Sequence, residues 1–148
     1  MDWYDLTDKY HGQTLESDGN LSSLSHEWQR ELAAIWRLEA DVNNGTYLQF
    51  IGNWDVLTYE YALRCLRNIG AKKMARIIEK CHKLVLKHTV STLPDAKRFK
   101  GLMSNPVMNL DGSITTPEPS PLPQNVTQKI YDLSYRVMDY PDDIAATT

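Results

Sequence analysis

The sequence is poor in cysteine and has no long hydrophobic run. Its 148 residues contain two cysteines, Cys65 and Cys81, which do not form a CxxC pair. This argues against a disulfide scaffold or a cysteine zinc cluster, and we expect two buried core thiols. No stretch approaches the roughly eighteen consecutive apolar residues of a membrane helix. Residues 1–20 are acidic and lack the apolar region of a secretory signal, so we expect a cytoplasmic protein.

Signatures of catalysis are also lacking. The sequence has no glycine-rich phosphate loop, no strand-turn-helix nucleophile motif and no serine with a recognisable base partner. His26 begins like a zinc-protease helix, but the position of the second histidine holds Arg30. Cys81 and His82 would point about 100° apart on a helix and would not share one metal ion unaided. We therefore expect no catalysis, no metal and no cofactor, with His82 and His88 at the surface or its boundary.

The net charge of −3 hides a segregation of signs along the chain. Residues 1–60 carry eleven acids and three bases, residues 61–100 two acids and eleven bases, and residues 101–148 six acids and two bases. The segment charges are therefore −8, +9 and −4. Such a chain neutralises itself, presents two opposed patches, or pairs its acidic front with the basic middle of a second copy. The sequence leaves these three arrangements open.

Hydrophobic periodicity predicts helices along most of the chain. Apolar residues recur three or four positions apart over residues 27–42, with Ser25 as the N-cap. The Asn-Asn-Gly turn at 43–45 would end this helix, because these residues tolerate left-handed backbone geometry. Similar spacing predicts further helices over residues 47–54, 58–69 and 71–88. No strand-like alternation of useful length is present, so the predicted fold class is all-α.

The C-terminal third contains most of the prolines. A short helix is predicted over residues 92–100. Residues 101–125 hold five of the seven prolines and an Asp-Gly pair, which predicts an extended connection. A final helix is expected over about residues 126–140, because Asn125 and Gln128 have the spacing of a capping box. We expect the whole chain to form one compact multi-helix domain.

The helix predicted over residues 71–88 has a basic side. On a helical wheel six cations fall on an arc beside the apolar face, in a row about 22 Å long. We call them the basic ridge, which comprises Lys72, Lys73, Arg76, Lys80, Lys83 and Lys87. The basic ridge fits a phosphate backbone, an acidic protein surface or simple solvation of the helix. Because it lacks interleaved aromatic residues for base stacking, nucleic acid is the less favoured interpretation.

The acidic front offers a complementary surface. Carboxylates on rigid helices can imitate the phosphate pattern that a DNA-binding protein expects. The candidate acidic surface comprises Asp2, Asp5, Asp8, Glu27, Glu31, Asp41 and Asp55. Glu39 falls within the apolar arc of the 27–42 helix, so it requires a hydrogen-bonding or ionic partner unless it is a functional acid. Arg37 and Asp41, four residues apart, are expected to form an exposed helix pair.

Residues 38–53 carry a recognisable signature. An acid is followed by Val-Asn-Asn-Gly, an aromatic residue, a glutamine, a second aromatic residue and an asparagine, and Ile-Gly-Ala follows at 69–71. This arrangement resembles a bacterial DNA-mimic protein family, many of whose members are otherwise described as a domain of unknown function. The acid is aspartate rather than the usual glutamate, and Thr46 replaces the family's second glycine. The likeness covers residues 22–100 and, more loosely, the last helix. The motif positions are Asp41, Asn43, Asn44, Gly45, Gln49 and Asn53.

The resemblance implies an all-helical domain with neither cofactor nor catalysis. For DNA mimics of this family it also implies an acidic surface, presented by a homodimer, that occupies the DNA-binding face of a helix-turn-helix transcription regulator. The motif is interpreted as architecture, in which Gln49 and Asn53 satisfy backbone groups at the turn. We therefore expect a non-enzymatic protein whose acidic surface contacts a DNA-binding regulator. The alternatives are a binder of nucleic acid or of an anionic partner through the basic ridge, and an immunity-type protein that neutralises a basic toxin.

Overall fold

The computed structural model describes residues 2–88, 107–108, 110–115 and 122–142. Within them the chain forms five α-helices, two short 3₁₀ helices and one β-hairpin of two-residue strands. The all-α class predicted from the sequence is confirmed. The elements are α1 (Trp3–Thr14), 3₁₀ helices at Leu15–Ser17 and Leu21–Ser23, α2 (Glu27–Asn53), α3 (Val56–Asn68), α4 (Lys72–His88), β1 (Val107–Met108), β2 (Ile114–Thr115) and α6 (Gln124–Met138).

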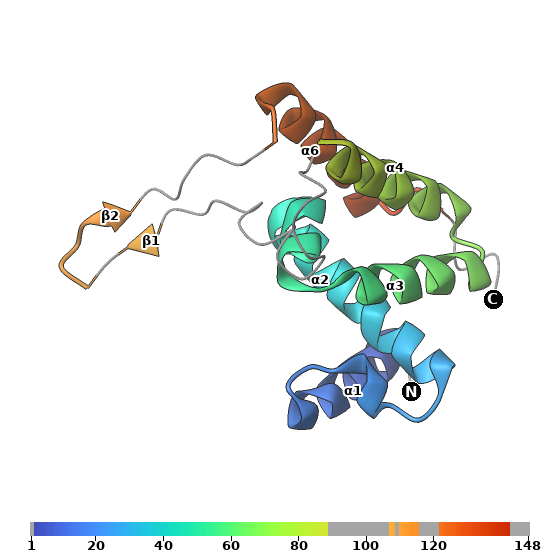
Figure 1. Ribbon diagram of the computed structural model, residues 1–148. Helices are drawn as coiled ribbons and strands as arrows, with labels where there is room; N and C mark the ends of the chain where they lie inside the picture. The colour runs from blue at the N-terminus through green and yellow to red at the C-terminus, as the bar shows by residue number, and fades with distance from the viewer. Residues whose placement is uncertain (1, 89–106, 109, 116–121, 143–148) are drawn as a thin grey trace.

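Helix α2 lies at the centre of the molecule (Figure 1). It packs against α1, α3 and α6, while α4 packs against α3 and α6. Figure 1 shows α1 and the α4–α6 pair on opposite sides of α2. Buried apolar side chains from these helices belong to one hydrophobic cluster, which includes the fully buried Phe50, Ile78 and Ile130. The hairpin of β1 and β2 stands apart from the helices (Figure 1).

Helix α2 is interrupted where the sequence predicted its end. Gly45 and Thr46 have non-helical backbone angles, with φ −164° and ψ 26° at Gly45 and φ 72° and ψ −178° at Thr46. The interruption leaves the Tyr47 amide without its helical acceptor, and this N–H donates instead to Ser134 Oγ of α6 at 3.0 Å. Ser134 Oγ in turn donates to the carbonyl of Ile130 at 2.7 Å. One hydrogen bond, from Tyr47 to Ser134, therefore joins the break to α6.

The N-caps of two helices differ from the predictions, by one residue in α2 and by two in α6. The N-cap of α2 is His26 rather than Ser25, and its N–H donates to the Gln29 side chain at 3.2 Å. Ser25, the residue before the N-cap, donates its hydroxyl to the same Gln29 amide oxygen at 3.2 Å. Helix α6 begins at Gln124 instead of Asn125, with Pro123 at the N-cap. The expected capping box is wrong, since Gln128 donates to Asp132 one turn ahead.

Helix α1 was not foreseen, because the opening residues were interpreted only as an acidic segment. The Asp2 side chain caps this helix by accepting the Asp5 N–H at 2.8 Å. The helix predicted over residues 92–100 lies outside the described residues. The expected connection at 101–125 is described at 107–108, 110–115 and from 122 onward, and there it contains the unpredicted hairpin.

The length and apolar character of the helices were compared with those of a membrane-spanning helix. In the part of the chain that the structure describes, no helix combines the length and the apolar character needed to cross a bilayer.

Candidate functional site

The acid and two amides of the signature form one hydrogen-bonded cluster inside α2. The Asp41 carboxylate accepts from Gln49 Nε2 and Asn53 Nδ2, both at 3.3 Å, and from Trp54 Nε1 at 2.8 Å. The expected role for Gln49 and Asn53 is therefore corrected, since their amides donate to this carboxylate rather than to backbone groups. Burial raises the pKa of Asp41, although these hydrogen bonds and the Arg37 charge oppose the shift. Asp41 is a half-buried brace across the break.

Arg37 is buried beside this cluster, with 1% of its surface exposed. Its Nε donates to His11 Nδ1 at 3.2 Å, and its Nη2 donates to Thr14 Oγ1 at 2.9 Å and to the Gly19 carbonyl at 2.7 Å. Nη1 donates to Thr58 Oγ1 at 3.3 Å. The predicted exposed pair of Arg37 with Asp41 is thus wrong. The guanidinium instead ties α1 and the turn after it to α2 and α3.

Among the described residues no carboxylate lies within 4.0 Å of the Arg37 nitrogens, and an aromatic ring contacts its charge instead. Its guanidinium lies 3.8 Å from the centre of the Trp54 ring, which is a cation–π geometry. Burial lowers the pKa of Arg37 to about 10, while the charges of Asp55 and Asp41 oppose this shift. The side chain therefore remains a cation at neutral pH. An open hollow of about 480 Å³ lies beside it and is also lined by Asp18 and Asp55.

Two buried histidines complete the polar interior. His11 stacks on Trp36, and burial together with the Arg37 charge lowers its pKa to about 4. His82 stacks on Tyr59 and its Nδ1 lies 2.7 Å from the Tyr47 hydroxyl, while burial lowers its pKa to about 4. The expectation that His82 lies at the surface or its boundary is wrong, because only 6% of it is exposed.

The two cysteines have the properties of structural rather than reactive thiols. Cys65 and Cys81 are free and buried as predicted, and burial raises the pKa of each thiol to about 12. Both thiols are therefore protonated at neutral pH and are poor nucleophiles. Among the described residues, no group of three or more histidine, cysteine, aspartate or glutamate side chains is arranged to hold a metal ion.

The candidate acidic surface divides into free and paired carboxylates. Asp2, Asp5 and Asp8 are exposed on α1, and within the described residues none of them has a lysine or arginine nitrogen within 4.0 Å. Asp55 is exposed too, and it caps α3 by accepting the Thr58 N–H at 2.9 Å, just as Asp2 caps α1 by accepting the Asp5 N–H. The freest part of the acidic surface is therefore α1.

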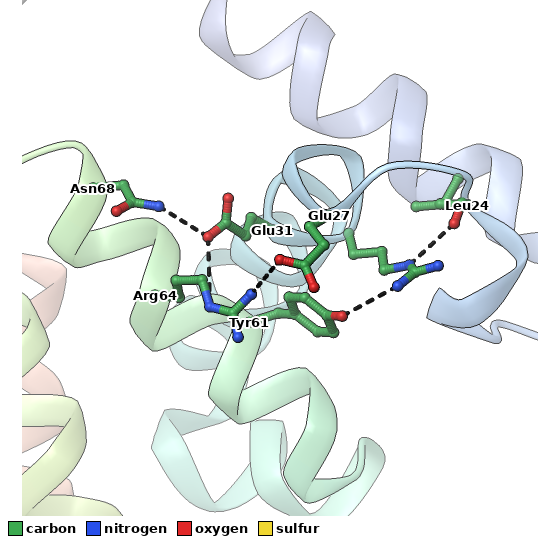
Figure 2. A network of polar contacts seen from close by, with 7 residues as sticks. Leu24, Glu27, Glu31, Tyr61, Arg64 and Asn68 are labelled. Atoms are coloured by element: carbon green, nitrogen blue, oxygen red, sulfur yellow. Dashed lines mark hydrogen bonds and ion pairs between the residues drawn. The ribbon is translucent and has the colours of Figure 1, made fainter.

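The two glutamates at the start of α2 face α3 instead. Figure 2 shows Glu27 and Glu31 directed at Arg64. Their carboxylates lie 2.9 and 3.9 Å from the Arg64 guanidinium, and Asn68 donates to Glu31 at 2.9 Å. Arg30 extends this network from α2 by donating to the Leu24 carbonyl and the Tyr61 hydroxyl. These two glutamates are thus partly neutralised by the chain's own cations.

All six residues of the basic ridge are exposed on α4. Lys83 pairs with Glu79 at 3.0 Å, and Arg67 of α3 contacts the same carboxylate. Figure 1 places α4 and α1 on opposite sides of α2. The arrangement of charge therefore combines two of the predicted possibilities, with local neutralisation between α2 and α3 and opposed acidic and basic helices at the two sides.

The remaining motif residues form the break itself. Asn43 and Asn44 are exposed in the last turn before it, and Gly45 and Thr46 provide the non-helical angles. Thr46 stands where the family pattern has glycine, and its φ of 72° lies in the region that favours glycine. Its buried Oγ1 has no hydrogen-bond partner within the described part of the chain. The signature residues therefore lie at the break of α2 and in the hydrogen bonds across it.

Comparison with protein families agrees with this signature. Residues 22–113, more than half of the chain, match the family described as DMP19-like protein. This is the DNA-mimic protein family, and it is not a known enzyme family. Searches among curated proteins and among solved structures returned no match. The match, together with the hydrogen-bonded break at the centre of α2, shows that this chain belongs to the DMP19-like family.

Proposed function

We propose that this protein binds a basic DNA-binding protein through the carboxylates of α1 and acts there as a DNA mimic without catalysis. The observation that carries the proposal is the set of exposed carboxylates of Asp2, Asp5 and Asp8, which have no intramolecular cation within 4.0 Å in the described residues. Family membership supports the same class of activity. The partner proposed is a helix-turn-helix transcription regulator, and a homodimer would double the acidic surface.

The spacing of these acids suits the proposal. Carboxylates three residues apart on a helix advance about 4.5 Å along its axis, which is of the same order as the rise of roughly 3.4 Å along the duplex axis from one phosphate of a DNA strand to the next. A row of negative charge also steers a basic partner toward the surface over long range. Glu27, Glu31 and Asp41 contribute less to such a surface, because internal donors already engage their carboxylates.

A capture experiment in the source cell tests this function. The full chain is compared with a variant carrying Asp2→Asn, Asp5→Asn and Asp8→Asn, and a Glu27→Gln/Glu31→Gln variant serves as the control. We expect the wild-type chain and the control to retain a helix-turn-helix regulator that is released by salt and displaced by its operator DNA. The triple variant should lose it. Equal capture by all three proteins, or capture insensitive to salt, contradicts the proposal.

The exposed basic ridge supports a second candidate, binding of nucleic acid or of an acidic partner. Only Lys83 of the six ridge residues lies within 4.0 Å of a carboxylate in the described part of the chain. A gel-shift assay with generic duplex DNA at low salt tests it. Retardation that disappears on changing Lys80 and Lys83 to Glu would favour this candidate, and absence of retardation would remove its nucleic-acid form. An immunity-type role would use the α1 carboxylates against a basic nuclease, whose inhibition is directly measurable.

A further inference from the structure

An apolar hollow of about 120 Å³ opens beside Glu39, where α2, α3 and α4 meet the C-terminal end of α6. Its floor consists of side chains that are at least nine-tenths buried, including Leu38, Leu66 and Met74. A drug-sized ligand needs a pocket of roughly 300 Å³ or more, whereas an apolar cavity of about 150 Å³ accommodates benzene. The hollow therefore matches a single apolar side chain in size.

A second hollow of about 210 Å³ shares Glu39 and Asn43 with the first and is also lined by Tyr4 and Trp36. Large aromatic side chains project around the pair. Trp3 lines the first hollow and is 42% exposed, Tyr4 is 63% exposed, and Tyr140 at the rim of the first is 51% exposed. Exposed tryptophan and tyrosine beside a concave apolar surface are typical of the residues that dominate protein–protein binding energy.

The charge of this surface indicates what kind of partner fits it. Among the residues that the structure describes, Glu39 is the only charged one that lines either hollow. Its Oε1 accepts the Tyr140 hydroxyl at 2.8 Å, and this bond holds the carboxylate between the two hollows. The exposed Asp2 and Asp5 flank Trp3 and Tyr4 in the sequence. A partner segment therefore meets negative charge around an apolar anchor point.

We propose that the two hollows form an anchor site for a basic amphipathic helix of a protein partner. One leucine, isoleucine or methionine of that helix enters the smaller hollow, and a lysine or arginine one helical turn away pairs with Glu39. The inference rests on the proposed function, because it assigns to the same basic partner an apolar contact beside the α1 carboxylates. The hollows would discriminate between partners by the shape of the inserted side chain, and exposed carboxylates alone do not provide this selectivity.

The test uses a phage-displayed library of random helical peptides selected on the full chain. We expect enrichment of peptides with an apolar residue three or four positions from a lysine or arginine. Trp3→Ala should weaken a selected peptide at least about tenfold, as loss of an interface aromatic anchor does. Ile69→Phe, which adds bulk at the partly exposed rim of the hollow, should weaken it similarly. Glu39→Gln should weaken it about threefold or more, and less at high salt.

Matched variants separate this site from general effects. Trp28→Ala removes another half-exposed tryptophan, and Glu60→Gln another exposed carboxylate, and neither residue lines a hollow. Both should change peptide affinity by less than about twofold. Thermal unfolding of every variant shows whether it remains folded. If Trp3→Ala proves unstable, Ile69→Phe and Glu39→Gln decide the result on their own.

The outcomes distinguish this inference from the proposed function. Peptides that require the α1 aspartates but ignore Trp3→Ala and Ile69→Phe overturn the anchor site and leave the proposed function intact. Peptides that require Trp3 and Glu39, while the triple aspartate variant still captures its regulator, support the anchor site and contradict the proposed function. Enrichment of neutral peptides, or of none, overturns the inference. A dimer that Trp3→Ala converts to a monomer also overturns it, because a second copy would then occupy the site.

Discussion

The signature residues inside the family-matched segment and the aspartates of α1 outside it differ in what their polar groups contact. Within residues 22–113, the Gln49 and Asn53 side-chain amides donate to the Asp41 carboxylate across the break in α2. Outside that segment, Asp2, Asp5 and Asp8 are exposed on α1. The matched segment therefore contains the hydrogen-bonded break of α2, whereas the proposed binding surface lies on a helix that the family match does not reach. Membership of the DMP19-like family therefore supports inferences about the fold of this chain more directly than inferences about its binding surface.

The largest expected effect tests the interior. Arg37→Met leaves the acceptors of His11, Thr14 and Gly19 without a donor and removes a buried cation–π contact. We expect a loss of about 3 kcal/mol or more in the free energy of unfolding, measured with urea. Arg30→Met is the matched control, because Arg30 is only partly buried, and it should cost about 1 kcal/mol. Equal losses for the two variants would contradict the assigned role of Arg37.

The second effect is a loss of stability in acid that arises from the buried histidines. Their pKa values of about 4 lie below the value of 6.5 for an unperturbed histidine. Between these values the unfolded chain binds more protons than the folded one, so stability falls as the pH falls from about 7 to 4. Each of the two histidines contributes up to about 3 kcal/mol to this loss.

Urea unfolding at pH 7, 5.5 and 4 measures the acid effect. The pKa of Asp41 is raised by burial, so its protonation acts in the opposite direction at low pH and reduces the loss. His82→Gln should flatten the pH dependence, because it removes one of the two histidines whose pKa is lowered by burial. A stability that does not change over this range would contradict the burial of neutral His11 and His82.

The third effect is a gain of stability at the break. Thr46→Gly relieves a backbone conformation that costs a non-glycine residue about 1–3 kcal/mol, and it removes a buried hydroxyl without a partner. Glycine also has more conformational entropy in the unfolded chain, and this lowers stability. When this cost is subtracted, we expect a net stabilisation of about 1 kcal/mol. Asn44→Gly, in the preceding helical turn, should destabilise by about 0.5–1 kcal/mol. A loss of stability with Thr46→Gly would contradict the strained geometry.

The smallest effect concerns the paired glutamates. Glu27→Gln removes one ion pair whose side chains are 68% and 48% exposed, and such a pair contributes about 0.5 kcal/mol or less. Thermal unfolding should therefore show little change, and the difference should shrink further with added salt. A loss above about 1 kcal/mol would show that the network drawn in Figure 2 is a structural element of the same kind as the Arg37 contacts.

The helices and the break were predictable because local patterns determine them. The 27–42 periodicity and the Asn-Asn-Gly turn need no tertiary information, and the family signature placed them correctly. Burial of Arg37 was not predictable from the same pattern, since it lies off the apolar stripe of α2. The available signal was Ala33-Ala34, because two fully buried alanines away from that stripe mark a helix that is covered on more than one side.

Hydrogen bonds between residues far apart in the sequence were also not predicted. The exposed pair of Arg37 and Asp41 followed from their spacing of four residues, which is the correct rule for a surface helix but the wrong one for a central helix. Asp41 meets Trp54 thirteen positions away, and Tyr47 meets Ser134 eighty-seven positions away. Helical periodicity contains no information about such contacts, because they depend on how the helices pack.

One measurement tests most directly whether the exterior of α1 carries the function. The dissociation constant of the purified chain for its captured regulator is measured at several salt concentrations, for the wild type and for the Asp2→Asn/Asp5→Asn/Asp8→Asn variant. Asn at position 2 keeps the helix cap, so the variant should remain as stable as the wild type within about 0.5 kcal/mol. We predict weaker binding and a shallower salt dependence for the variant. Identical affinity and identical salt dependence for the two proteins would contradict the account.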